Sequence, residues 1–108
     1  IGPALVTTAT VVTVDVVPPS VPTGLTTTSR SRRYIDIRWQ PSTDDRAGTI
    51  RYALFRNKRR IARITGTFFT DRPPYLGTYR YRVRAIDAAG NKSAFTLRVT
   101  GTAVRRVP

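Results

Sequence analysis

Short runs of alternating apolar and polar residues cover most of the chain and predict β-strands. In the clearest run, Thr78 to Asp87, tyrosine, valine and alanine at odd positions alternate with three arginines at even positions. A period of two is typical of a strand with one buried face. The same pattern predicts strands at Gly24–Ser29, Tyr34–Trp39, Ile50–Arg56, Arg60–Ile64, Thr67–Asp71 and Ala94–Thr102. No stretch repeats apolar residues at helical spacing, so the sequence predicts an all-β protein.

Seven short strands within about 80 residues favour a small two-sheet sandwich. Each alternating strand supplies one apolar face, and two sheets must cover each other's apolar faces. When the arginines of the Thr78–Asp87 strand face solvent, Tyr79 and Tyr81 point inward, so we expect these tyrosines in the core. The expected architecture is a seven-stranded, immunoglobulin-like sandwich with an extra N-terminal strand.

Four stretches of the sequence resemble the fibronectin type III family. They are Pro18–Leu25, Ile35–Trp39 followed by Pro41 and Asp44–Asp45, Tyr52–Arg56, and Leu76–Ala85 followed by Asp87–Ser93. The resemblance implies three strands facing four, with Trp39 in the core and the Tyr79 hydroxyl bonded back to nearby backbone. The Asp-Ala-Ala-Gly-Asn segment at 87–91 is similar to bacterial members found in secreted, multi-module proteins. The Arg-Gly-Asp loop of the family's integrin-binding members does not occur.

The composition excludes several kinds of chemistry. The chain has no cysteine and no histidine, and all six of its acidic residues are aspartates. Disulfides, thiolate or imidazole metal sites and histidine-dependent nucleophiles are therefore absent. Asp44 and Asp45, with Asp71, Asp87 and Asn91, could supply calcium-binding oxygens, but an aspartate in a turn more often caps its own backbone. We therefore predict a protein that is not an enzyme and that holds no metal or cofactor.

The net charge of +13 is carried by 19 basic residues. Arg80, Arg82 and Arg84 share one face of one strand, and Arg51 and Arg98 are expected to extend this exposed basic face. Such a face could bind an acidic glycan or another polyanion, or it could only keep the sheet solvated and unpaired. Two further basic clusters, at Asn57–Arg60 and at Arg30, Arg32 and Arg33, allow the same two interpretations. Nucleic acid is disfavoured as a partner, because inward-pointing tyrosines cannot stack on bases.

The N-terminal segment Ala4–Val17 is β-branched almost throughout and is followed by Pro18-Pro19. We therefore divide the chain into an N-terminal strand extension (1–17), a fibronectin type III domain (18–102) and a C-terminal tail (103–108). An exposed strand of this kind needs a partner. The partner could be a sheet of the next copy, a preceding domain or the chain's own sandwich. Pairing with the next copy would join copies head-to-tail into a homo-oligomeric filament, with Val6, Val12, Val14 and Val16 as the inserting side chains.

The sequence favours a non-catalytic structural module, in the first place a subunit of an extracellular filament or surface assembly. The alternatives are a spacer module of a secreted polysaccharide-degrading enzyme, and a virion surface domain or polyanion-binding module. The chain begins at Ile1 and contains no methionine, which indicates a processed protein or a fragment and favours an extracellular location, on a cell or virion surface. No run of about 18 apolar residues occurs, so no membrane span is expected.

Overall fold

The computed structural model describes residues 16–108, which form seven β-strands and no helix. The strands are β1 (Thr23–Arg30), β2 (Tyr34–Gln40), β3 (Arg51–Arg56), β4 (Arg59–Ile64), β5 (Phe68–Asp71), β6 (Gly77–Ile86) and β7 (Val99–Ala103). Each strand overlaps one of the seven predicted strands. Six of them differ from the prediction by no more than one residue at either end, and the exception is β7. The all-β, two-sheet prediction is therefore confirmed.

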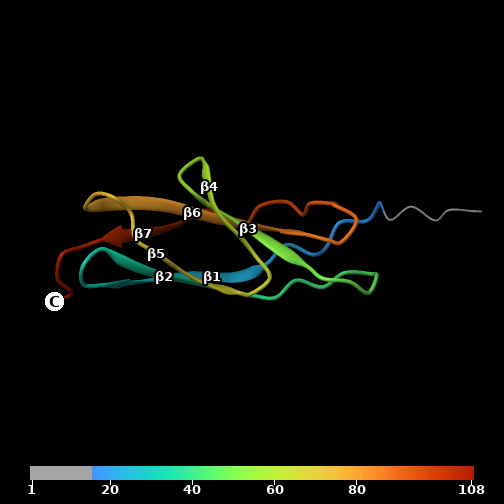
Figure 1. Cartoon of the computed structure of the whole chain (residues 1–108), viewed down its shortest axis with the longest axis horizontal. Helices are drawn as coiled ribbons and strands as arrows, with labels where there is room; N and C mark the ends of the chain where they lie inside the picture. The colour runs from blue at the N-terminus through green and yellow to red at the C-terminus, as the bar shows by residue number, and fades with distance from the viewer. Residues whose placement is uncertain (1–15) are drawn as a thin grey trace, which may run out of the picture.

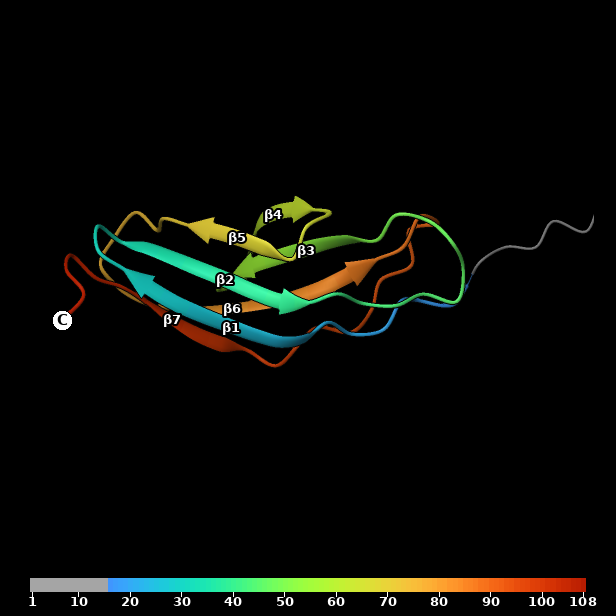
Figure 2. The ribbon, with the colours of Figure 1, turned by 90° about the horizontal axis from the view of Figure 1, so that it is seen from below.

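Two antiparallel sheets face each other, as Figures 1 and 2 show. Strands β1, β2 and β5 form a three-stranded sheet in the order β1-β2-β5. The other four strands form a second sheet in the order β4-β3-β6-β7. The three-against-four division is the one that the fibronectin type III resemblance implies.

The core lies between the sheets and is built from the inward-facing residues of β2, β3, β6 and β7. Its buried members are Ile35, Ile37, Trp39, Tyr52, Leu54, Tyr81, Val83, Ala85 and Ala103. Trp39 and Tyr52 pack edge-to-face, with ring centroids 5.6 Å apart. The Tyr52 hydroxyl accepts a hydrogen bond of 2.8 Å from the backbone amide of Ser42. Alternation along the strands therefore produces the core directly, because every second residue meets the opposite sheet.

The two sheets approach closely along β1 and β7, which belong to different sheets. The Thr27 hydroxyl donates to the carbonyl oxygen of Thr100 at 2.7 Å, and the Ser29 hydroxyl donates to that of Thr102 at 2.6 Å. Gly101 lies between these two acceptors and is buried. A Cβ atom at Gly101 would lie only 3.0 Å from side-chain atoms of Ile35 and Tyr81. Glycine at this position therefore allows the close contact between the sheets.

The predicted strand Ala94–Thr102 is wrong in its first half, because regular pairing begins only at Val99. The segment before β7 still runs beside β6, but side-chain hydroxyls replace part of the ladder. Ser93 Oγ and Thr96 Oγ1 accept hydrogen bonds from the amides of Ala85 and Val83. This irregular pairing breaks the period of two, and Leu97, which strict alternation would place on the apolar face, is 89% exposed.

The lead-in segment and the C-terminal tail are attached at opposite ends of the sandwich (Figure 1). Before β1, Pro19 and Pro22 are buried, and the Ser20 amide donates to the carbonyl oxygen of Thr43, beyond the end of β2. After β7, the amide of Arg33 donates to Val104 O and that of Arg32 donates to Arg105 O, before the start of β2. Strand β2 connects these two ends, and its seven residues span about 23 Å.

The proposed N-terminal donor strand falls almost entirely outside the described residues. Val6, Val12 and Val14 lie in residues 1–15, beyond the described part of the chain. Val16 is described and is 73% exposed. Its role in pairing with another copy stays a prediction, as do the domain boundaries at residues 17 and 102.

Candidate functional site

The outer face of the four-stranded sheet carries a cluster of arginine and phenylalanine. Phe55 of β3 and Phe95 pack edge-to-face, with ring centroids 5.1 Å apart and planes at 88°. The guanidinium carbons of Arg82 and Arg84 lie 3.9 Å and 4.5 Å from the centre of the Phe95 ring. The Nε atoms of both arginines are buried and have no hydrogen-bond partner within residues 16–108. Cation–π stacking therefore holds these two guanidinium groups in place on the sheet.

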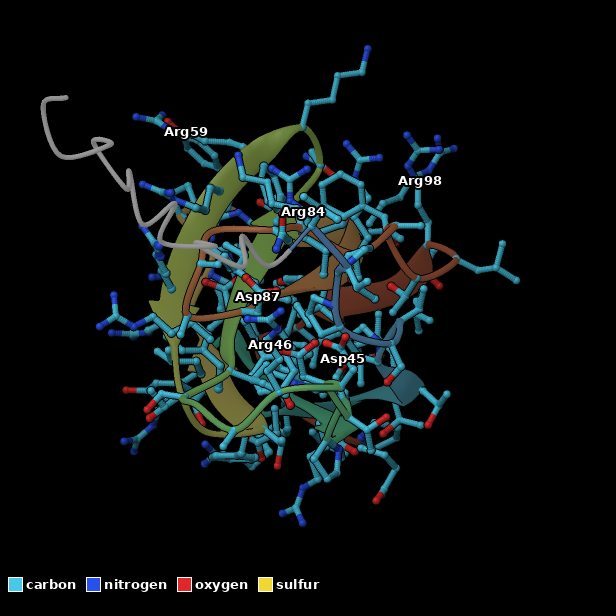
Figure 3. All side chains as sticks on the ribbon, turned by 90° about the vertical axis from the view of Figure 1, so that its right-hand side faces the viewer. Asp45, Arg46, Arg59, Arg84, Asp87 and Arg98 are labelled. Carbon is cyan, nitrogen blue, oxygen red and sulfur yellow. The ribbon has the colours of Figure 1, made fainter. Side chains whose placement is uncertain are left out.

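The structure divides the predicted basic face into two kinds of arginine. Arg51, Arg80 and Arg98 are exposed, whereas Arg82 and Arg84 are half-buried. The expectation that all five would be exposed is therefore wrong for Arg82 and Arg84, because the rings of Phe55 and Phe95 cover their side chains. Figure 3 shows Arg84 and Arg98 on the side of the molecule formed by the four-stranded sheet.

Next to this cluster lies the basic hollow, a depression of about 590 Å³ lined by Asn57, Lys58, Thr78, Arg80 and Arg98. Asn57 and Lys58 form the turn between β3 and β4, and Asn57 adopts a left-handed conformation with a φ of 56°. The Asn57 amide donates to the carbonyl oxygen of Arg80 at 2.6 Å, and its side-chain oxygen accepts from the Arg80 amide at 3.0 Å. These two bonds extend the β3–β6 ladder by one residue and fix the turn beside Arg80.

The three cations of the basic hollow have no anionic partner within residues 16–108. Lys58, Arg80 and Arg98 take part in no salt bridge there, and no acidic residue lines the hollow. The hydroxyl of Thr78 lies 3.3 Å from that of Thr102. The hollow therefore combines a concentrated positive charge with polar groups that can bond to hydroxyl-rich ligands.

A second, smaller hollow of about 330 Å³ lies on the same sheet near the other end of β3. It is lined by Thr49, Arg51, Arg63, Asp87, Ala88 and Gly90. Its one carboxylate, Asp87, accepts hydrogen bonds from the backbone and side-chain nitrogens of Asn91, at 2.8 Å and 3.0 Å. This hollow therefore has a mixed charge, unlike the basic hollow.

The aspartates considered for calcium lie in separate parts of the structure. The Asp44 carboxylate accepts from the amide of Asp45 in the loop after β2, while Asp87 bonds to Asn91 in the loop after β6. Asp71 lies on β5 and bonds to Arg56 and Tyr81. Within residues 16–108, no group of three or more acidic side chains is arranged to hold a metal ion.

Two aspartates instead neutralise arginines, one pair partly buried and the other at the surface. Asp71 bonds to Arg56 at 2.8 Å and accepts a hydrogen bond of 2.6 Å from the Tyr81 hydroxyl. Burial, and then the bond to Asp71, raise the pKa of Tyr81 well above its ordinary value of 10.0. On the three-stranded sheet, Arg30 bonds to Asp36 at 2.7 Å. This hydrogen bond is the main cause that lowers the pKa of Asp36 below 3.8.

The remaining predicted site residues lie in the interior. Trp39 and Tyr81 are 2% and 0% exposed, and the indole nitrogen of Trp39 has no hydrogen-bond partner in the described structure. Tyr79 is partly buried against the core. Its hydroxyl donates to the carbonyl oxygen of Tyr75 at 2.8 Å, which is the backbone contact that the resemblance implies.

The sequence pattern did not identify the role of Phe95 or the hollow beside Lys58. Strict alternation over the predicted strand Ala94–Thr102 would place Phe95 on the inward face, and only the irregular segment before β7 places it on the outer face with Arg82 and Arg84. Asn57 and Lys58, part of the predicted basic cluster at Asn57–Arg60, form the turn between β3 and β4. The contact of this turn with Arg80 depends on the pairing of β3 with β6, which are far apart in the sequence.

In the part of the chain that the structure describes, no helix is long and apolar enough to cross a membrane.

Comparisons with known proteins identify similar segments in polysaccharide-degrading enzymes. Exoglucanase A of Cellulomonas fimi is 37% identical over 87% of this chain, and an alpha-amylase of Niallia circulans is 36% identical over 82%. Chitinase Chi52 of Paenibacillus xylanexedens is 39% identical over 76% of the chain. The matched segment is only 11%, 7% and 16% of these three proteins, respectively. No protein-family model matches the chain.

Solved structures show the same fold. The crystal structure of FN3tt matches with a TM-score of 0.66 and 18% identity, over 81% of this chain and 96% of that one. This similarity agrees with the three-against-four arrangement of the sheets and with the Tyr79 contact. The chain therefore has the fibronectin type III fold, which it shares with the solution structure of a fibronectin type-III domain of human fibronectin type III domain containing protein 3 (TM-score 0.63, 19% identity, over 82% of this chain and 88% of that one).

Proposed function

We propose that this chain is a non-catalytic spacer module of a longer extracellular protein that degrades polysaccharides. The observation that carries the proposal is the match of 36–39% identity to an exoglucanase, an alpha-amylase and a chitinase. These enzymes are named for three different polymers. A segment common to them is better suited to a shared mechanical task than to recognition of one substrate.

The positions of the two ends support a spacer that keeps its neighbours apart. The lead-in is docked at one end of the sandwich by buried Pro19 and Pro22, and the tail is tied at the other end through Val104 and Arg105. Domains joined before and after the module would therefore lie on opposite sides of it. The β-sheets and the core fix both attachment points. The module would therefore hold the two neighbouring domains apart more firmly than a flexible linker would.

The alternative of a head-to-tail filament depends on Val6, Val12, Val14 and Val16. Three of these four lie outside the described residues, so the filament stays a prediction without support from the fold. The extracellular location rests on the same relatives as the spacer function and is part of this proposal.

A fusion protein tests the spacer function directly. A glucanase catalytic domain would precede the chain and a cellulose-binding domain would follow it. The matched control replaces residues 18–108 by a Gly/Ser linker of equal length. We expect equal hydrolysis of a soluble glucan by both fusions, and faster hydrolysis of insoluble cellulose by the fusion that contains the folded module. Equal rates on the insoluble polymer would contradict the proposal, as would a reading frame that encodes no polysaccharide-active domain.

A further inference from the structure

We infer that the basic hollow is a binding site for an acidic polysaccharide, one whose sugar residues carry carboxylates. The inference extends the proposed function, because it assigns this module a contact with a particular class of polymer. It rests on the charge, the shape and the fixed side chains of the hollow formed by Asn57, Lys58, Thr78, Arg80 and Arg98.

Unpaired charge is the first reason. The exposed cations Lys58, Arg80 and Arg98 lie around one depression of about 590 Å³ without any carboxylate among its lining residues. Elsewhere in the described structure, Arg30 and Arg56 are neutralised by Asp36 and Asp71. Three cations that face one depression repel each other, and an anionic ligand would remove this repulsion while forming charge-assisted hydrogen bonds.

A continuous row of cations is the second reason. Arg80, Arg82 and Arg84 occupy alternate positions on the outer face of β6, so neighbouring Cα atoms are about 6.6–6.8 Å apart. The row begins in the basic hollow and leads along the sheet past the rings of Phe55 and Phe95. Stacking on these rings holds Arg82 and Arg84 in place, so less side-chain entropy would be lost when they contact a ligand. A row of this kind suits a linear polymer with regularly repeated charges better than a single small anion.

The aromatic side chains favour a polysaccharide over a single-stranded nucleic acid. Bases would need a free aromatic face for stacking. Phe55 and Phe95 contact each other and the guanidinium groups of Arg82 and Arg84, and Tyr81 is buried in the core. The hollow instead offers the Thr78 hydroxyl and the Asn57 side-chain nitrogen, polar groups that match sugar hydroxyls.

The experiment measures binding of the full chain to polygalacturonate, with a neutral glucan of similar length as the uncharged probe. The test variant is Lys58→Gln/Arg80→Gln/Arg98→Gln. The matched control is Arg63→Gln/Arg105→Gln/Arg106→Gln, which removes three exposed arginines outside the basic hollow. We expect the test variant to bind polygalacturonate at least about tenfold more weakly, and the control to change by less than about threefold. Binding by the wild-type chain should weaken as salt is raised, and the neutral glucan should not bind.

A second measurement does not depend on the stability of the variants. Amide chemical shifts of the wild-type chain, titrated with a short galacturonate oligomer, should change at Asn57, Thr78 and Arg98. Shift changes confined to other residues, or equal losses of affinity in the two triple variants, would overturn the inference. So would tighter binding of duplex or single-stranded DNA than of polygalacturonate at the same salt concentration. Absence of binding together with a positive fusion experiment would refute this site and leave the spacer function intact.

Discussion

Replacing Gly101 by alanine tests how closely β1 and β7 approach each other. The new Cβ atom would lie 3.0 Å from Ile35 Cγ2, 3.0 Å from Tyr81 Cε2 and 3.4 Å from Thr27 Cβ. Carbon atoms prefer separations of about 3.5–4.0 Å. Ile35 and Tyr81 are both 0% exposed and have little room to move. Overpacking of this kind costs about 1–3 kcal/mol, and the lower entropy of the unfolded alanine chain offsets about 0.4–1 kcal/mol of it.

We therefore expect Gly101→Ala to lower the free energy of unfolding by about 1–2 kcal/mol. The matched control is Gly66→Ala, because Gly66 has no atom within 4 Å of its would-be Cβ and is not among the glycines with positive φ. The control should be neutral or more stable by up to about 1 kcal/mol. Urea unfolding followed by the fluorescence of Trp39, the single tryptophan, measures both variants. If Gly101→Ala is as stable as wild type, the close contact of the two sheets along β1 and β7 is refuted.

Three further predictions concern hydrogen bonds that the structure places in and around the core. Tyr81→Phe leaves Asp71 without one donor and should destabilise the fold by about 1–3 kcal/mol in urea unfolding. The fold raises the pKa of Tyr81. The Tyr81 hydroxyl therefore stabilises the folded state fully below pH 10.0, and this stabilisation is lost as pH rises further. Thermal melts of Tyr81→Phe should therefore lack this alkaline loss, and an identical loss in the variant would contradict the assignment. Asp36→Asn should melt lower than wild type near neutral pH, and the difference should shrink as pH falls below 3.8, because the folded state lowers the pKa of Asp36. A difference that stays constant down to about pH 2 would show that the Arg30–Asp36 contact has no such role. Tyr79→Phe removes the bond to the Tyr75 carbonyl and should cost about 1 kcal/mol, and an unchanged melting temperature would show that this bond contributes nothing.

Local alternation was sufficient to predict most of the fold. The strand β6 was predicted within one residue at each end, because Tyr79, Tyr81 and Val83 alternate with arginines without interruption. The prediction failed before β7, where Ser93 and Thr96 use side-chain hydroxyls in place of regular pairing. A pattern of period two carries no information about such a change in pairing, so strict alternation would place Phe95 and Leu97 on the wrong face.

The candidate site was only partly predictable. The sequence predicts Arg80 and Arg98 as members of one basic face, and Lys58 as a member of the basic cluster at Asn57–Arg60. Their common hollow required the register of β3 against β6, in which Arg56 pairs with Tyr81. Asn57 then bonds to Arg80 and brings the turn to the edge of the face. This register is a long-range property, set by how two distant strands pack their apolar sides against the other sheet.

The sequence alone determined that this chain is an all-β sandwich without histidine or thiol chemistry and with a large excess of arginine. It determined this because side-chain period, composition and charge are local or additive properties of the chain. Only the tertiary structure decided which arginines are neutralised, which are stacked on phenylalanine and which surround the basic hollow. Those differences between arginines arise from contacts between strands that are distant in the sequence. The packing of the two sheets determines all of these contacts at once.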